Sequence, residues 1–156
     1  MDLEIERKFL VTSMAFKREA IQKYKIIQGF LCTNKKRTVR VRLKDDQGYL
    51  TIKGMSSEDG LSRMEWETEI SKNDAENLLK LCKKDIIEKD RFLVKVEDHM
   101  FEVDEFKGIN HGLVLAEIEL NAPDEAIKKP DWLGDEVTGK PQYYNACLSK
   151  NPYKLW

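Results

Sequence analysis

Glutamate, lysine and arginine recur at every second position in several short segments of this 156-residue chain. The opening segment carries Glu4, Glu6 and Lys8, and a later one carries Arg40 and Arg42. Guanidinium groups offer paired donors that match phosphate geometry, and closely spaced carboxylates suit a hard divalent cation such as Mg²⁺ or Mn²⁺. These residue types together predict a site for a metal-bound polyphosphate.

The segments that carry these charges have the period of β-strands. A strand sends successive side chains to opposite faces, so residues two apart share a face. Short turn-forming stretches separate the segments, as expected of antiparallel strands. Eight strands are expected, near residues 2–11, 25–32, 36–45, 48–54, 62–71, 87–96, 99–106 and 113–121. Eight are enough to close a barrel.

One face of the predicted sheet is charged on nearly every strand, and the opposite face is apolar. Its expected members are Glu4, Glu6, Lys8, Arg40, Arg42, Lys53, Arg63, Glu65, Glu67, Lys89, Arg91, Glu102, Asp104, Glu117 and Glu119. An antiparallel sheet with one solvated face would alternate in the same way. However, the charges come in blocks of one sign on each strand, whereas a surface that serves solubility alone mixes its signs.

Helical spacing of apolar residues interrupts the strand pattern in three places. One helix is expected after Thr12 and Ser13, carrying Met14, Phe16, Ala20 and Ile21. A second should begin at Ser71, whose side chain can cap the first turn. A third should begin at Pro141, run through Leu148 and close one mouth of the barrel. If the sheet closes with its apolar face outward under helices, the charged face becomes the lining.

These elements predict a mainly β (α+β) fold: an eight-stranded antiparallel β-barrel with helices packed outside, in a single domain over residues 1–156. The chain has 27 basic and 28 acidic residues, so no nucleic-acid partner is expected. No apolar run reaches membrane-spanning length, and the N-terminus lacks the pattern of a signal peptide. We therefore expect a cytoplasmic protein, a monomer or homodimer, that does not engage a membrane.

The opening segment, residues 4–8, contains Glu-x-Glu-x-Lys and resembles the signature of the CYTH domain, or triphosphate tunnel metalloenzyme, superfamily. Later elements of that family follow in order, and the resemblance covers essentially the whole chain. They are Val39-Arg40-Val41-Arg42, Leu50-Thr51-Ile52-Lys53, Arg63-Met64-Glu65-Trp66-Glu67, Lys89-Asp90-Arg91, Val103-Asp104, Ala116-Glu117-Ile118-Glu119-Leu120 and Glu136-Val137-Thr138-Gly139. The compact chain looks most like the short bacterial members that hydrolyse inorganic or nucleoside triphosphates.

The resemblance implies a tunnel that binds a triphosphate, and a role for each matched residue. The implied ligands of Mg²⁺ or Mn²⁺ are Glu4, Glu6, Glu117 and Glu119. The implied phosphate contacts are Lys8, Arg40, Arg42, Lys53, Lys89 and Arg91. We assign catalysis to Glu4, Glu6, Lys8, Arg40 and Lys53. The roles of the remaining lining residues stay open: Arg63, Glu65, Glu67, Glu102 and Asp104.

The expected activity is metal-dependent hydrolysis of a triphosphate, inorganic or nucleoside, by a phosphoanhydride hydrolase. One alternative is a class IV-type adenylate cyclase that makes cyclic AMP from ATP, because the same cations and metals would serve both reactions. A second alternative is a non-catalytic polyphosphate-binding module. The metal-type glutamates count against the binding module, since binding alone needs mainly the basic residues.

Overall fold

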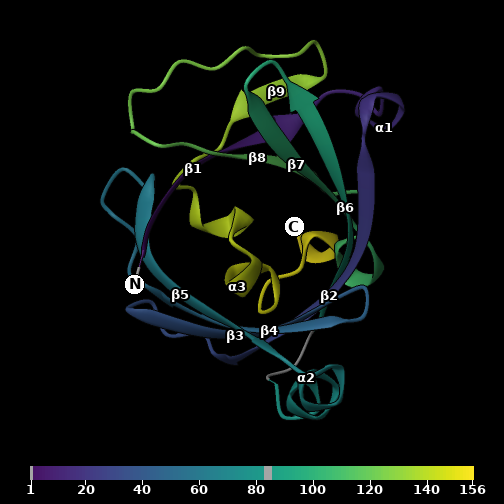
Figure 1. Cartoon of the computed structure of the whole chain (residues 1–156), viewed down its shortest axis with the longest axis vertical. Coiled ribbons are helices and arrows are strands. Elements are labelled where there is room, and N and C mark those ends of the chain that lie inside the picture. Colours follow the sequence, from purple (N-terminus) through teal and green to yellow (C-terminus); the bar gives the residue numbers. More distant parts are fainter. Residues whose placement is uncertain (1, 83–85) are drawn as a thin grey trace.

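Nine β-strands form one antiparallel sheet in the computed structural model, which describes residues 2–82 and 86–156. They are β1 (Asp2–Val11), β2 (Gln22–Cys32), β3 (Arg37–Lys44), β4 (Gln47–Gly54), β5 (Ser62–Ile70), β6 (Ile87–Val96), β7 (His99–Phe106), β8 (Val114–Glu119) and β9 (Leu133–Glu136). The sheet order is β5-β4-β3-β2-β6-β7-β8-β1-β9, and β5 also pairs with β1. This last pairing closes eight strands into a barrel (Figure 1).

All eight predicted strands are confirmed, and β9 is the strand that the sequence did not reveal. Its four residues, Leu-Gly-Asp-Glu, carry no apolar alternation. It pairs beside the second half of β1, at Phe9 and Val11, whereas β5 pairs with the first half, from Asp2 to Ile5. One edge of β1 is therefore shared by two strands.

The outward faces of β1, β6, β7 and β8 form an apolar core outside the barrel wall. Phe16, on the short helix α1 (Phe16–Glu19), packs edge-to-face against Phe92 and Trp132 at 5.4 and 5.9 Å between ring centroids. Trp132 also meets Phe101 at 5.5 Å. Burial of such large aromatic side chains supplies much of the driving force that turns the apolar face outward.

Helix α2 (Lys72–Leu79) covers the outer face of β3 and β4. The Ser71 side chain accepts a hydrogen bond from the Asp74 backbone nitrogen at 3.0 Å, which confirms the predicted cap. Ala75 is fully buried against β4. A Cβ at Gly48 would lie only 2.7 Å from the Ala75 Cβ, so this strand position must be glycine for the helix to sit so close.

Two of the predicted helices are shorter than the apolar spacing suggested. Helix α1 ends at Glu19, and Ala20 is already extended, so Ile21 leads into β2 instead of lying on the helix. The last helix is broken at Tyr144, whose ψ of 136° separates the 3₁₀ turn η2 (Pro141–Tyr143) from α3 (Asn145–Leu148). Two further 3₁₀ turns are η1 (Gly108–Asn110) and η3 (Tyr153–Leu155). No helix in the described part is long and apolar enough to cross a membrane.

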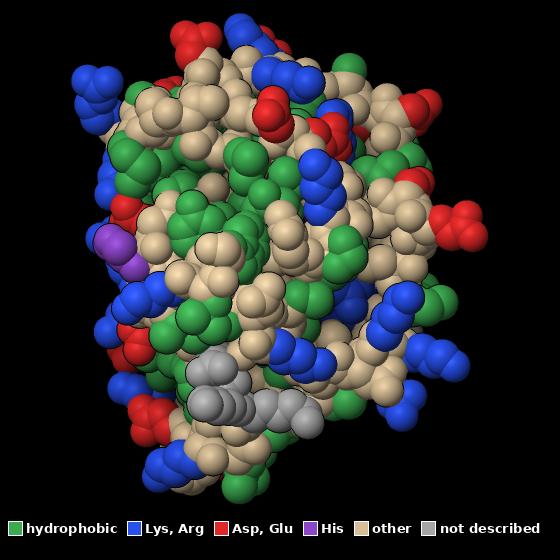
Figure 2. Space-filling model, turned by 180° about the vertical axis from the view of Figure 1, so that it is seen from behind, with side chains coloured by type: hydrophobic (Ala, Val, Ile, Leu, Met, Phe, Trp, Pro, Cys, Tyr) green, Lys and Arg blue, Asp and Glu red, His purple; other side chains and the backbone are tan. Residues whose placement is uncertain are grey.

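The C-terminal segment lies across the ring of strands, with η2 and α3 inside its outline (Figure 1). Leu148 is fully buried in a second apolar cluster that includes Val137 and inward-facing strand residues such as Ile87, Phe106 and Leu115. Figure 2 shows the molecule from behind the view of Figure 1. Hydrophobic side chains gather over the middle of this rear face, with Lys and Arg side chains around them. The last helix thus closes one end of the barrel, as the sequence predicted.

Candidate active-site tunnel

A cavity of about 280 Å³ lies inside the barrel and is lined almost entirely by charged side chains. Its cations are Arg40, Arg42, Lys44, Lys53 and Arg91, and its carboxylates are Glu4, Glu6, Glu65, Glu67, Glu102, Glu117 and Glu119. The structure therefore brings together all four predicted metal ligands and four of the six predicted phosphate contacts. The other two predicted contacts, Lys8 and Lys89, are not among the lining residues.

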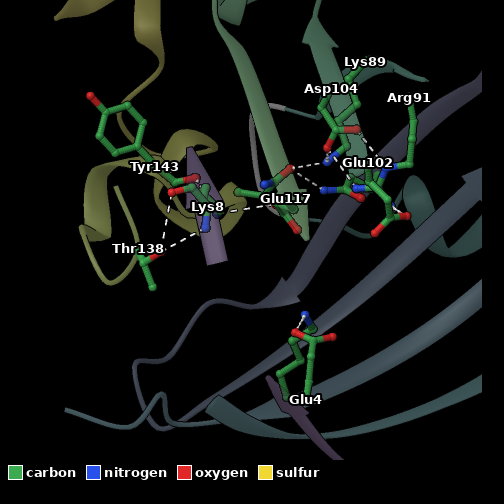
Figure 3. Close-up of polar contacts among 12 residues, drawn as sticks. Glu4, Lys8, Lys89, Arg91, Glu102, Asp104, Glu117, Thr138 and Tyr143 are labelled. Atoms are coloured by element: carbon green, nitrogen blue, oxygen red, sulfur yellow. Dashed lines mark hydrogen bonds and ion pairs between the residues drawn. The ribbon is translucent and has the colours of Figure 1, made fainter. Parts of the chain in front are cut away.

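Lys8 is bound by the segment that closes the barrel. Its Nζ donates to the Tyr143 carbonyl oxygen at 3.1 Å and lies 3.6 Å from Glu117 Oε1. The same Nζ is 5.2 Å from the centre of the Tyr144 ring, within cation–π range. In Figure 3, Lys8 lies between Glu117 and Tyr143. Its charge is thus shared between a tunnel carboxylate and the C-terminal segment.

Lys89 is buried between a carboxylate and the same segment. Its Nζ lies 2.8 Å from Asp104 Oδ2 and donates to Asn145 Oδ1 at 2.9 Å. Burial lowers the pKa of Lys89 to about 7, with Arg91 and Arg42 adding to the effect and Asp104 opposing it. Lys89 therefore supports the wall of the site, with its ammonium group bound by Asp104 and Asn145.

Arg91 is held on two sides by carboxylates. Its Nε and Nη2 donate to the two oxygens of Asp104 at 2.8 and 2.9 Å, and Nη1 donates to Glu102 at 2.9 Å. Burial alone would lower the pKa of Arg91, but Asp104 and Glu102 raise it well above its ordinary value. Figure 3 shows Asp104 flanked by Lys89 and Arg91. Glu102 and Asp104, whose roles the sequence left open, thus fix this arginine.

Arg40 and Arg42 are held more loosely. Arg40 Nη2 donates to Thr51 Oγ1 at 3.1 Å and lies 3.6 Å from Glu67, but its buried Nε has no hydrogen-bond acceptor among the described residues. Arg42 Nε donates to Gln28 Oε1 at 2.8 Å. Burial lowers the pKa of both guanidinium groups, and repulsion from neighbouring arginines lowers it further. The pKa of Arg42 falls to about 9. An anion in the cavity would relieve both effects.

The carboxylates on β1 and β8 are crowded. Glu4 Oε1 accepts a hydrogen bond from Lys53 Nζ at 2.8 Å, and Lys53 also lies 3.7 Å from Glu65. Burial raises the pKa of Glu6 well above its ordinary value, and the charges of Glu117 and Glu4 raise it further. Burial also acts to raise the pKa of Glu117, but nearby cations, with Lys8 first, hold it well below the usual range.

Within residues 2–82 and 86–156, no three His, Cys, Asp or Glu side chains already converge on one metal-sized point. The donor set nevertheless fits a divalent cation. Glu6 is a carboxylate whose neighbours Glu117 and Glu4 disfavour its charge, so a cation beside it would remove that repulsion. Burial, Glu4 and Glu102 likewise raise the pKa of Glu119. Oxygen-only ligands are those that Mg²⁺ and Mn²⁺ prefer.

The tunnel opens at the end opposite the C-terminal segment. Glu102 and Glu119 line both the tunnel and a wider cavity of about 660 Å³, which also includes His99 and Glu125. His99 Nε2 and Glu125 Oε2 form a hydrogen bond at the rim. A ligand would therefore reach the arginines by passing an acidic mouth.

Like Lys8 and Lys89, two further predicted lining residues are absent from the cavity lining: Asp104, which binds Lys89 and Arg91, and Arg63 on β5. Arg63 Nε and Nη2 both donate to the Gly54 carbonyl oxygen, at 3.1 and 2.9 Å. Conversely, sequence reasoning missed Gln28 and Asn145, which contact the tunnel cations directly. Gln28 shares its face with Ile26 and Phe30, so no charged residue on that face of its strand marked it. Asn145 lies on a terminal helix with no link in sequence to the barrel strands.

Comparison with known proteins supports the geometry. The CYTH domain family matches residues 2–146. An inorganic triphosphatase of Acetivibrio thermocellus is 49% identical over 155 residues, covering 99% of this chain and 97% of that protein. An inorganic triphosphatase of Nitrosomonas europaea is 35% identical over 150 residues, covering 94% and 96% of the two chains. A crystal structure of an inorganic triphosphatase superposes with a TM-score of 0.68 at 30% identity, covering 96% and 95%.

Proposed function

The chain belongs to the CYTH domain family, and from that premise we propose that it is a divalent-metal-dependent enzyme that hydrolyses inorganic triphosphate. The single observation that carries this proposal is the tunnel, in which arginines and Lys53 face a group of glutamates across one cavity. A triphosphate with a divalent cation carries the complementary charges. The relatives that are 49% and 35% identical over nearly their whole lengths are both inorganic triphosphatases.

In the proposed reaction, the basic residues bind and orient the triphosphate. Arg40 and Arg42 carry charge that protein carboxylates only partly neutralise, so they are the strongest attractors for phosphate oxygens. Arg91 is already fixed by Asp104 and Glu102, so its guanidinium needs no reorganisation when the substrate arrives. Lys53 lies between Glu4 and Glu65, and it would stabilise the charge that develops as the phosphoanhydride bond breaks.

The proposed metal is Mg²⁺ or Mn²⁺, held by Glu4, Glu6, Glu117 and Glu119. When bound, a divalent ion supplies neutralisation of phosphate charge and a lower pKa for a bound water. Burial, with the charges of Glu117 and Glu4 adding to it, raises the pKa of Glu6, so the metal-free enzyme holds a proton there more tightly than an isolated glutamate does. Metal binding would displace this proton, so metal affinity should fall as the pH is lowered.

The test is parallel product analysis with tripolyphosphate and ATP, each with Mg²⁺, with Mn²⁺ and with EDTA. The proposal expects orthophosphate and pyrophosphate from tripolyphosphate in the presence of metal, and no products in EDTA. Cyclic AMP and pyrophosphate from ATP, without hydrolysis of tripolyphosphate, would assign an adenylate cyclase instead. Tight binding of tripolyphosphate without any turnover would assign the non-catalytic binding module and refute the enzyme.

A further inference from the structure

Gln28 connects the tunnel to the C-terminal segment. It lies on β2, opposite Arg42 on β3, and its side chain is completely buried. Its Oε1 accepts a hydrogen bond from Arg42 Nε at 2.8 Å, and its Nε2 donates to Asn145 Oδ1 at 2.7 Å. The same Asn145 oxygen accepts from Lys89 Nζ at 2.9 Å. Four side chains from β3, β2, α3 and β6 are therefore linked in one chain of hydrogen bonds.

The direction of these hydrogen bonds is fixed by the two cations at the ends. A guanidinium group and a lysine ammonium group only donate, so Gln28 presents its carbonyl oxygen to Arg42, and Asn145 presents its carbonyl oxygen to the Lys89 ammonium group. Only the amide nitrogen of Gln28 remains to face Asn145. Neither carboxamide can turn over without placing two donors in contact, and the arrangement is therefore held in one orientation.

The contact at Nε determines how Arg42 can meet a ligand. In the described part of the chain, the guanidinium of Arg42 has one side-chain hydrogen bond, to Gln28, and no ion pair within 4.0 Å. Because Gln28 occupies Nε, the two terminal nitrogens, Nη1 and Nη2, remain for an anion in the cavity that Arg42 lines. Arg91 differs, because carboxylates already take hydrogen bonds from Nε, Nη1 and Nη2.

We propose that Gln28 and Asn145 are positioning residues for the phosphate site: Asn145 orients Gln28, and Gln28 turns the terminal nitrogens of Arg42 toward the substrate. The proposal rests on the proposed triphosphatase function. It also makes α3 a part of the active site, because Asn145 is the first residue of that helix. The segment that closes the barrel would then fix the orientation of a substrate-binding arginine inside the barrel.

The test is a set of kinetic measurements of tripolyphosphate hydrolysis with Mg²⁺. Gln28→Leu keeps the size of the side chain but removes both hydrogen bonds, so kcat/KM should fall about tenfold, mainly through KM, the loss expected for one hydrogen bond to a charged group. Asn145→Leu should act in the same direction by about threefold to tenfold. Asn110→Leu is the control: Asn110 Oδ1 accepts from the Tyr153 backbone nitrogen, so this variant loosens the C-terminal segment without touching Gln28.

Coupling to Arg42 separates positioning from a purely structural role. In an Arg42→Ala background, which should itself lower kcat/KM, Gln28→Leu and Asn145→Leu should have almost no further effect, because no guanidinium remains to be oriented. The thermal midpoint of each variant shows that it is folded. Additive losses in the double variants, or an equal loss in Asn110→Leu, would overturn the proposal, as would an unaltered kcat/KM in Gln28→Leu or in Arg42→Ala.

The wild-type enzyme distinguishes this failure from failure of the proposed function. If wild type does not hydrolyse tripolyphosphate, the function and the positioning role are both wrong. If wild type is active while the variants behave additively, only the positioning role is wrong, and the triphosphatase assignment remains.

Discussion

The interior of this barrel has two ends of opposite character, although both are built from the same strands. Along β1 the inward positions run from Glu4 to Leu10, and along β8 they run from Glu119 to Leu115. On β7, likewise, Glu102 lies at the open end and Phe106 at the closed end. These three strands change from charged to apolar toward the C-terminal segment.

The difference shows how a small barrel can contain a strongly charged site and still be stable. The apolar end buries Leu148, Val137 and Phe106 together, and such burial stabilises the fold. The charged end carries carboxylates whose pKa is raised by burial and crowding, which indicates that it is not optimised for stability. Substitutions at the charged end should therefore change activity, and those at the apolar end should change stability.

The largest expected effect is the loss of turnover in Glu4→Gln. The variant removes one negative charge from the carboxylate group proposed to hold the metal, so metal-dependent kcat should fall by about 1000-fold or more, on the order of 4 kcal/mol. Phosphate release with Mg²⁺ and Mn²⁺ measures this. Glu105→Gln is the matched control, because Glu105 binds Lys17 and Lys107 outside the tunnel. Activity of Glu4→Gln close to that of wild type would contradict the assigned role of the charged end.

At the apolar end, Leu113→Ala should lower the free energy of unfolding by about 2–4 kcal/mol. Leu113 is 4% exposed and packs in the cluster that closes the barrel, so the substitution removes buried apolar contacts without changing any charge. Urea unfolding monitored by circular dichroism gives the change in stability. kcat/KM at a temperature where the variant is folded should stay within about threefold of wild type. A large loss of activity in the folded variant would show that the two ends are not separable.

How much of this arrangement the sequence reveals depends on which residues decide it. The period-2 pattern predicted the eight barrel strands and which side chains face inward, because strand geometry fixes both locally. It could not distinguish Lys8 and Lys89 from Arg40, since all three are cations on inward positions. Their different partners come from Tyr143 and Asn145, which approach only after the chain has folded.

The position of the closed end was equally hidden. A glutamate and a leucine two residues apart on one strand have the same parity, and nothing local says that one meets a cavity and the other a helix. The short strand β9 was missed because it has no apolar alternation and pairs where β5 leaves the edge of β1. Both features depend on contacts between segments that are not neighbours in the sequence, such as β1 with β9 and α3 with β6.

An intermediate effect is expected at Arg40. Arg40→Ala should raise KM for tripolyphosphate about tenfold, corresponding to about 1.4 kcal/mol. Arg40 lines the cavity, and although its Nη2 donates to Thr51, its buried Nε has no acceptor in the described part of the chain, so the guanidinium is available to the substrate. Arg7→Ala is the control on the outer face of the same barrel, where Arg7 binds Glu136. Steady-state kinetics of both variants would decide the matter. An equal rise of KM in Arg7→Ala would mean that general charge, and not the tunnel position, governs binding.

The smallest effect should be a gain of stability in Glu6→Gln when metal is removed. Burial, Glu117 and Glu4 raise the pKa of Glu6 in the folded protein above its value in the unfolded chain. Between these two pKa values the folded state holds a proton that the unfolded state has released. The contribution of Glu6 to stability is therefore fully present below the unfolded pKa and is lost as the pH rises through the folded pKa.

Glutamine cannot ionise, so Glu6→Gln should escape this loss. In EDTA, the thermal midpoint of wild type should decline relative to that of the variant as the pH is raised from about 5 to about 9, leaving the variant more stable at the alkaline end. Added Mg²⁺ should stabilise wild type and leave the variant nearly unchanged, because the ion binds the carboxylate that the variant lacks. A midpoint difference that is independent of pH and of Mg²⁺ would mean that Glu6 is an ordinary structural residue, and the contrast between the two ends of the barrel would no longer rest on the carboxylates.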